Sequence, residues 1–231
     1  MRQGCCVLLT KWCCHRMKLL AIETSTSCAS VALTCGGACY VDTREGVAEH
    51  ARFLLPMVER LLQEADMRLE TLDGIVFGQG PGSFTGIRIA CAVAKGLAFA
   101  ADVPLYPVST LRAMAGCVDT PTLVLLDARM NQLYWAVAGL PQQAFREQVS
   151  NAENINVAGE MPLEVVGFGF EPYRDALAPA LRARILSECS RRPDAELLIA
   201  RVREGEVMPV SAAEALPVYI RDNVTHGAKN G

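Results

Sequence analysis

The 231-residue chain is long enough for one large domain or two small ones, and its 51% hydrophobic and 20% charged residues are typical of a globular protein with a large core. Its formal net charge of -3 argues against a protein that binds nucleic acid by itself, because such proteins normally carry a basic face. Binding to nucleic acid as part of a larger assembly stays open.

The first 16 residues hold four of the ten cysteines, as two vicinal pairs. Their apolar run is too short for a membrane span or a signal peptide, and Met17-Lys18-Leu19-Leu20 reads as a natural start. We therefore expect residues 1–16 to be a disordered leader or a non-native extension. The vicinal pairs with His15 could hold a soft metal, but their spacing matches no standard zinc site, and we predict no metal.

The remaining cysteines are scattered without a Cys-x-x-Cys pair, and a chain of this size and apolar content does not need disulfides. We expect reduced thiols, no membrane-spanning segment and a cytoplasmic location.

Three consecutive strands are predicted near the start, at residues 18–23, 28–34 and 38–43. The first is an apolar run that ends in Glu23. A hydroxyl-rich turn, Thr24 to Ser27, joins the first two strands, and Gly36-Gly37 is typical of the two-residue turn of a hairpin.

An amphipathic helix is predicted at residues 49–67, because one stripe of that segment is apolar: Leu54, Val58, Leu61, Leu62 and Ala65. Pro56 is expected to kink this helix or to mark its true first turn. A short buried strand is predicted at residues 74–77.

A glycine-rich loop at residues 78–88 launches the next helix. Four glycines and one proline fall within nine residues, so the chain is expected to turn sharply there. Ser83 is a good candidate to cap the helix that runs to Ala101. Arg88 and Lys95 are the only charges of this helix. It must therefore be covered on two sides, by its own domain and by something else.

A strand at 104–108 and a short helix capped by Ser109 follow, and then a second unit begins. Its strands at 123–127 and 133–137 repeat the outline of the first unit, because the first of them again ends in an acid, Asp127, and is followed by a polar turn. Further elements are expected in this order: a variable surface region at 140–160, a strand at 163–168, helices at 172–181 and 194–204, a linker at 209–217 and an extended segment at 218–221. We predict an α/β fold with subdomains at 17–116 and 117–231, each a mixed sheet flanked by helices, and the last segment could return to the first subdomain.

Five stretches of the sequence occur in a recognisable order: Glu23-Thr24-Ser25-Thr26 with Ser30 to Leu33, His50 to Pro56, Gly80-Pro81-Gly82-Ser83-Phe84-Thr85-Gly86-Ile87-Arg88, Asp127-Ala128-Arg129, and Pro217-Val218-Tyr219-Ile220-Arg221. They resemble the bacterial TsaB (YeaZ) family, in the glycoprotease-like branch of the actin/Hsp70/sugar-kinase (ASKHA) superfamily. The resemblance covers residues 17–224, and the loop from Gly80 to Arg88 is its most specific part. The chain departs from the family at Ala51, where a serine is usual, and in its leader.

The resemblance implies two actin-like subdomains and a role in tRNA modification. The family works as a required partner of TsaD, the catalytic subunit that transfers a threonylcarbamoyl group onto the adenosine next to the anticodon of ANN-decoding tRNAs. TsaE, an ATPase, completes the assembly. The resemblance further implies no chemistry by this chain, pairing with TsaD through N-terminal helices, a homodimer by the same surface when alone, no cofactor, and contact with tRNA only through the assembly.

The residues themselves also speak against chemistry. A metal enzyme of the TsaD type needs two histidines one helical turn apart, and the three histidines of this chain include no such pair. His50 is expected to be a surface or interface residue. The glycine-rich loop lacks the Gly-Lys-Ser/Thr ending of a Walker motif, and few histidines are available to activate Ser83 for a hydrolase or peptidase.

Two turns lie where this superfamily binds phosphate: Glu23, Thr24, Ser25 and Thr26 in the first unit, and Asp127 with Arg129 in the second. Backbone N–H groups of such turns could hold a phosphate, or the turns could survive only as structural hairpins. The second interpretation is favoured, because neither turn is glycine-rich and the bulky Phe168 and Phe170 could fill an adenine pocket. We treat the turns as vestigial.

The leading hypothesis is a non-catalytic scaffold whose partner interface lies on the two N-terminal helices. Small side chains would let helices approach closely, and apolar ones would fill the seam. The predicted interface consists of His50, Leu54, Val58, Leu61, Ile87, Ala90, Cys91, Ala94, Lys95 and Ala98. In the simplest alternative, the apolar helix is a core helix without a partner. In another, suggested by the repeated strand-acid-turn outline, the chain is a nucleotide-binding small-molecule kinase or ATPase of the sugar-kinase type.

Overall fold

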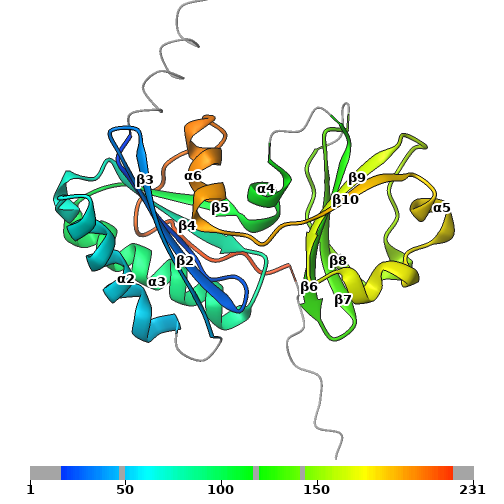
Figure 1. The fold of residues 1–231 in the computed structure, drawn as a ribbon, viewed down its shortest axis with the longest axis horizontal. Coiled ribbons are helices and arrows are strands. Elements are labelled where there is room, and N and C mark those ends of the chain that lie inside the picture. Colours follow the sequence, from blue (N-terminus) through cyan, green and yellow to red (C-terminus); the bar gives the residue numbers. More distant parts are fainter. Residues whose placement is uncertain (1–16, 47–49, 117–119, 141–143, 221–231) are drawn as a thin grey trace, which may run out of the picture.

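The computed structural model describes residues 17–46, 50–116, 120–140 and 144–220, and for His50 only the backbone (Figure 1). Two mixed five-stranded sheets lie next to each other, with strand orders β3-β2-β1-β4-β5 and β10-β9-β6-β7-β8. Helices flank each sheet, which confirms the predicted fold class. The predicted leader at 1–16 lies outside the described residues.

The first sheet consists of β1 (Leu19–Glu23), β2 (Cys28–Cys35), β3 (Ala38–Glu45), β4 (Gly74–Gly80) and β5 (Leu105–Ser109). β1 runs antiparallel to β2 and parallel to β4. Gly36 and Gly37 both have positive φ and turn β2 into β3, so the predicted hairpin is confirmed. β1 is buried along its whole length, which explains its continuous apolar run.

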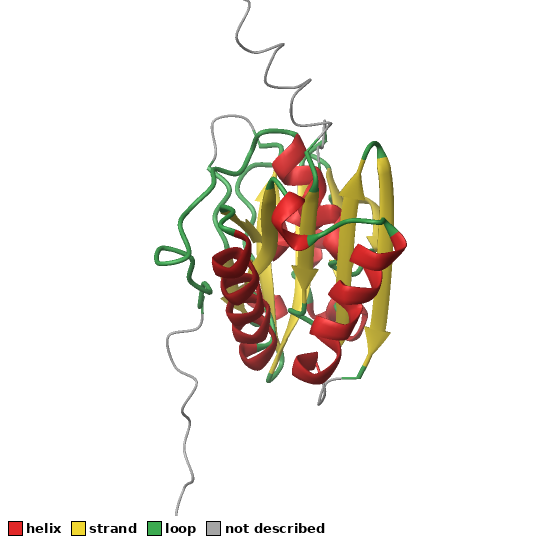
Figure 2. Cartoon of the chain, turned by 90° about the vertical axis from the view of Figure 1, so that its left-hand side faces the viewer, coloured by secondary structure: helices red, strands yellow, loops and turns green. Residues whose placement is uncertain are grey.

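Helices α2 (His50–Glu64) and α3 (Phe84–Ala101) lie side by side on one face of this sheet (Figures 1 and 2). Their inward stripes share one core cluster with Leu20, Ile22 and Phe77 of the sheet. By length and composition α3 could cross a membrane, and 39% of this helix is buried inside the chain. Pro56 lies inside α2, without ending it.

The other face of the first sheet is covered from the C-terminal part of the chain. Leu198, Ile199 and Val202 of α6 (Ala195–Arg203) pack with residues of β1, β2 and β4. The short helix α4 (Thr110–Ala115) packs on both sheets, since Ala113 joins that cluster while Leu111 contacts β6 and β7. The two sheets are therefore joined by a shared helix as well as by the chain.

The second sheet consists of β6 (Thr122–Arg129), β7 (Gln132–Ala138), β8 (Gln148–Ser150), β9 (Leu163–Phe168) and β10 (Ile185–Ser190). β6 runs antiparallel to β7 and parallel to β9, which is the arrangement of β1 with β2 and β4. The repeated outline in the sequence is thus a repeat of topology. The remaining helical elements of the described residues are η1 (Leu69–Thr71), η2 (Ala152–Asn154), η3 (Glu171–Ala176) and α5 (Pro179–Arg182).

Three features of the second half differ from the prediction. The sequence predicts neither β8, which has three residues, nor β10, whose side chains are mostly exposed and so form no apolar run. The region 140–160 is not only surface, because Ala152, Ile155 and Val157 enter the core. The helix expected at 172–181 is a 3-10 turn followed by one short helix.

The predicted helix caps are correct. The Ser83 hydroxyl accepts from the N–H of Gly86, and the Ser109 hydroxyl accepts from the N–H of Arg112. These bonds satisfy N–H groups that have no partner within the first turn of a helix.

Candidate functional site

The glycine-rich loop packs directly on the turn between β1 and β2. The N–H of Ser83 donates to the carbonyl oxygen of Ser25 at 2.7 Å, and the Thr24 hydroxyl donates to the carbonyl oxygen of Gly86 at 2.8 Å. β4 continues to Gly80 instead of ending at residue 77, so the first glycines of the loop belong to the sheet. The most specific stretch of the sequence therefore lies on the first predicted phosphate turn.

Glycines at every fourth position make this contact possible. A Cβ at Gly78 would overlap the carboxyl group of Glu23, and a Cβ at Gly86 would overlap the carbonyl oxygen of Thr24. A Cβ at Gly82 would lie 2.6 Å from the carbonyl oxygen of Ser25. Close approach of two backbones is thus a reason for the glycine motif that involves no phosphate.

The first predicted phosphate turn is covered as a result. Glu23, Thr24 and Ser25 are at most 3% exposed. The N–H of Ser25 donates to Glu23 Oε1 at 2.5 Å, so this backbone donor already has a partner. Burial raises the pKa of Glu23 above its ordinary value, which favours the neutral carboxyl group. Thr26 is partly exposed, and Ser27 is the first exposed residue of the turn.

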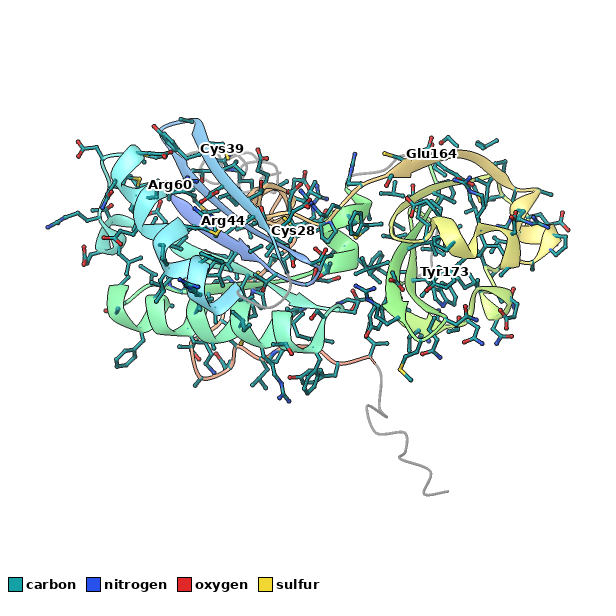
Figure 3. The ribbon with its side chains drawn as sticks, turned by 60° about the horizontal axis from the view of Figure 1, so that its bottom comes forward. Cys28, Cys39, Arg44, Arg60, Glu164 and Tyr173 are labelled. Atoms are coloured by element: carbon teal, nitrogen blue, oxygen red, sulfur yellow. The ribbon has the colours of Figure 1, made fainter. Side chains whose placement is uncertain are left out.

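The second predicted turn has its acid engaged as well. Asp127 Oδ1 accepts from the N–H of Arg129 at 2.8 Å and from the hydroxyl of Tyr173 at 3.1 Å. Burial and the charge of Asp127 raise the pKa of Tyr173, which lies in the second half of the molecule (Figure 3). Arg129, Met130 and Asn131 all have positive φ, a conformation that costs energy for side chains other than glycine.

A cleft of about 380 Å³ lies between the sheets and brings both turns together. Phe168 lines it as well, whereas Phe170 is buried in the core of the second sheet. The structure thus unites the predicted loop and both predicted turns in one cleft. Its lining also includes the C-terminal segment, and in full it is Ser25, Thr26, Ser27, Pro81, Gly82, Ser83, Phe84, Thr85, Ile87, Leu126, Asp127, Ala128, Arg129, Tyr134, Phe168, Gly169, Val218, Tyr219 and Ile220.

A cluster of Arg88, Phe84 and Tyr219 lies at this cleft. The Arg88 guanidinium carbon is 3.8 Å from the centre of the Phe84 ring, and Arg88 Nε donates to the Tyr219 hydroxyl at 2.7 Å. The rings of Phe84 and Tyr219 are 5.3 Å apart. Sequence reasoning placed Phe84 and Arg88 in the family-motif loop but missed their contact with Tyr219, because nothing local links residues so distant in the chain.

The predicted interface residues require a correction. Eight of them are at most 5% exposed: Leu54, Val58, Leu61, Ile87, Ala90, Cys91, Ala94 and Ala98. Seven of these belong to the core cluster of the first sheet, and Ile87 lines the cleft. Lys95 is partly buried and donates from Nζ to the carbonyl oxygen of Ala215, and the side chain of His50 lies outside the described residues. The small side chains Ala90, Ala94 and Ala98 let α3 approach the sheet closely, so this stripe of α3 is core. Val58 belongs to the core and also lines the outer groove between the helices.

The outward side of the helix pair carries other apolar residues. Phe99 is 85% exposed and Leu55 is 53% exposed. An apolar groove of about 390 Å³ lies between α2 and α3, lined by Leu55, Val58, Glu59, Leu62, Gln63, Met67, Leu69 and Leu97. Ala92 and Gly96 are exposed small residues on α3. Helical periodicity separates the buried stripe of α3 from its exposed stripe. Both stripes are apolar, so the sequence does not tell which of them faces the sheet.

Among the residues that the structure describes, no group of three or more His, Cys, Asp or Glu side chains is arranged to hold a metal ion. The vicinal cysteine pairs of the leader lie outside those residues.

Known proteins match both the sequence and the fold. A family model described as "TsaD: tRNA N6-adenosine threonylcarbamoyltransferase" matches residues 43–166. The tRNA threonylcarbamoyladenosine biosynthesis protein TsaB of Haemophilus influenzae is 31% identical, over 91% of this chain and 96% of its own length. The protein of the same name from Escherichia coli is 32% identical, over 90% of this chain and 96% of its own length.

Solved structures agree. A crystal structure from Pseudomonas aeruginosa, described as an uncharacterized protein with similarity to peptidase YEAZ, has a TM-score of 0.77 and 35% identity, and the match covers 89% of this chain and 100% of that one. YeaZ from the same organism has a TM-score of 0.75 and 35% identity, with 88% and 99% covered. Sequence and fold together show that the chain belongs to the TsaB (YeaZ) family of the glycoprotease-like ASKHA branch.

Proposed function

We propose that the chain is the non-catalytic partner of a TsaD-type transferase in the biosynthesis of threonylcarbamoyladenosine in tRNA. The names of the relatives from H. influenzae and E. coli support the pathway. The match of the TsaD family model to residues 43–166 supports the partnership, because that range contains α2 and α3. If this chain and TsaD have related folds, each can contact the other through its own copy of this helix pair.

The observation that carries the partner role is the exposed apolar side of α2 and α3. Phe99 and Leu55 protrude from it, and the groove between the helices is apolar except at Glu59 and Gln63. Apolar surface of this kind on a soluble domain typically marks an interaction site. Ala92 and Gly96 leave room for another helix to approach α3 closely. We propose this face, and not the buried stripe, as the TsaD contact and as the contact of a homodimer when the chain is alone.

The engagement of the acidic groups supports a role without chemistry. The Glu23 carboxyl group is buried under the glycine-rich loop, and Asp127 already accepts hydrogen bonds from Arg129 and Tyr173. A general base must reach the proton that it abstracts, and the buried Glu23 carboxyl group cannot do so. The chain has three histidines and no pair one helical turn apart. The proposal therefore assigns catalysis to TsaD, ATP hydrolysis to TsaE, contact with tRNA to the assembly, and the site of action to the cytoplasm.

Co-expression with TsaD tests the proposal. Leu55→Asp and Phe99→Asp place a charge on the exposed face and should fold, because both side chains are more than half exposed. We expect both variants to lose co-elution with TsaD in size exclusion and to reduce tRNA modification. Leu186→Asp is the matched control, because Leu186 is 67% exposed on β10 of the other sheet.

Two results would contradict the proposal. If both variants co-elute with TsaD and support modification like the control, the interface is elsewhere. If the chain modifies tRNA without TsaD, it is not a non-catalytic partner.

The second candidate is nucleotide binding, favoured by the position of the cleft. The cleft lies between the two sheets and is lined by Ser25 to Ser27 on one side and Asp127 to Arg129 on the other. The burial of Thr24 and Ser25 under the loop weighs against it, because a phosphate would need those backbone donors. Calorimetry of the full chain with ATP and Mg²⁺ decides the point. Micromolar binding with turnover by this chain alone would replace the scaffold proposal.

A further inference from the structure

The last described residues, Leu216–Ile220, cross from the first sheet to the second, and we call them the C-terminal strap. The N–H of Val218 donates to the carbonyl oxygen of Gln79 in β4 at 2.8 Å. Ile220 packs against the cluster formed by α4, β6 and β7. Figure 1 shows this part of the chain passing between the two halves. Val218, Tyr219 and Ile220 line the cleft, so the strap is one of its walls.

The strap begins at a firm anchor. Ala215 is 1% exposed and belongs to the core cluster of the first sheet. Its carbonyl oxygen accepts from Lys95 Nζ at 3.2 Å and from the thiol of Cys91 at 3.7 Å. Upstream, Val210 and Leu105 exchange both of their backbone hydrogen bonds. The chain is therefore held to α3 and β5 up to Ala215, and none of these contacts involves the strap.

Beyond Ala215 the contacts change in kind. Leu216 and Tyr219 are 64% and 43% exposed, so apolar burial holds the strap weakly. Three contacts remain: one backbone bond to Gln79, the packing of the partly buried Ile220 on the second sheet, and the cluster formed with Arg88. In that cluster Arg88 lies on the Phe84 ring and donates to Tyr219. A segment with few buried apolar contacts and exposed hydrogen bonds opens at low free energy.

We propose that the C-terminal strap is a releasable closure of the cleft and that Arg88 holds it shut. Release swings residues Leu216–Ile220 away from Ala215 while the rest of the chain keeps its fold. The cleft wall behind the strap, which includes Ala128 of β6, then opens to solvent. A ligand that binds in the cleft must displace the strap from the cleft wall. A movement of α3 also moves Arg88, which belongs to that helix, and so changes how the strap is held. This inference concerns only the cleft and does not depend on the partner role proposed above.

Hydrogen exchange of the full chain tests how the strap is held. The N–H of Val218 is the reporter, because it is bonded to Gln79. In Arg88→Ala we expect peptides covering 216–220 to exchange about tenfold faster, while peptides of β1 and β6 keep their wild-type rates. Tyr219→Ala removes the same contacts from the other side and should act in the same way. The matched control is Arg44→Ala on β3, the outer strand of the first sheet (Figure 3), where Arg44 lies 5.1 Å from the Phe53 ring.

Thiol labelling tests whether the strap closes the cleft. Ala128→Cys places a thiol on the cleft wall at a position that is 6% exposed, and peptide mass spectrometry reads this site separately from the native cysteines. Adding Arg88→Ala should speed labelling at residue 128 about tenfold, in proportion to the open population. Ala136→Cys, at a fully buried position outside the cleft, should stay protected in both backgrounds.

Either of two results overturns the proposal. If Arg88→Ala and Tyr219→Ala leave exchange in 216–220 at the rate of the Arg44→Ala control, Arg88 does not hold the strap. If exchange rises but labelling at residue 128 does not, or rises together with labelling at residue 136, the strap does not close the cleft.

Discussion

Arg88 and Tyr219 are separated by 131 residues in the sequence, yet Arg88 Nε donates a 2.7 Å hydrogen bond to the Tyr219 hydroxyl. Arg88 ends the glycine-rich motif and Tyr219 lies in the C-terminal motif, so the contact joins two of the five stretches that carry the family resemblance. The Phe84 ring lies under the same guanidinium. The start of α3 is thereby coupled to the end of the described chain, across the mouth of the cleft.

A double-mutant cycle with Arg88→Ala and Tyr219→Phe should measure this coupling. Both side chains are exposed, so water replaces much of what is lost, and we expect a coupling free energy of about 1 kcal/mol or less. The measurement is the free energy of unfolding in urea for the four proteins. Strict additivity of the two changes would mean that the bond adds no stability.

Gly86→Ala should destabilise the fold strongly, because a Cβ there would overlap the carbonyl oxygen of Thr24, a backbone atom. We expect a loss of about 3 kcal/mol or more, as for other overpacked sites where the backbone must move. Gly96→Ala on the same helix is the control, since a Cβ at Gly96 meets nothing within 4 Å. It should raise stability by about 0.5–1 kcal/mol through helix propensity. Equal urea midpoints for the two variants would contradict the packing account of the glycine motif.

Glu23→Gln should change how stability depends on pH. Burial raises the pKa of Glu23 in the folded chain above the ordinary value of 4.5, so the folded protein holds a proton that the unfolded chain releases. The stability linked to Glu23 is therefore full below pH 4.5 and is lost as the pH rises through the folded pKa. Relative to Glu23→Gln, the wild type should lose stability as the pH rises above 4.5. Parallel curves of unfolding free energy against pH would show that folding does not shift the pKa of Glu23.

Ala94→Asp and Ala92→Asp should behave in opposite ways although they lie two positions apart. Ala94 is fully buried against the first sheet, and a charge there should cost about 4 kcal/mol or more and unfold much of the chain. Ala92 is exposed, so the aspartate at that position should leave the unfolding midpoint within about 0.5 kcal/mol of the wild type. Circular dichroism during thermal unfolding compares them. A folded Ala94→Asp protein would return the buried stripe to consideration as an interface.

The most regular parts of the fold were predictable because their signals are local. Gly36-Gly37 turns β2 into β3, and Ser83 and Ser109 cap α3 and α4, since turn and cap chemistry depend on residues within a few positions. β10 was not predictable, because an exposed edge strand shows no apolar run. The 3-10 turn at η3 was read as helix, since its composition resembles one.

The candidate site divides in the same way. Its loop and both turns were found because each is a continuous stretch of sequence, and the structure brings them to one cleft. The position of Tyr219 and its neighbours in the cleft was not predicted. These residues are far from the loop and both turns in the sequence, so no local pattern shows that they line the same cleft.

By itself the sequence determined the family, the α/β class and the repeated strand-acid-turn outline, because these depend on residue order and periodicity. Only the tertiary structure decided what each apolar or glycine residue faces. It put Ala90, Ala94 and Ala98 against the first sheet and left Phe99 outside. It also showed that Gly82 and Gly86 lie on the β1–β2 turn and that Gly78 lies against Glu23 at the end of β1. The physical reason is that helical periodicity defines stripes but not their partners, and close backbone approach becomes visible only when both segments are in place.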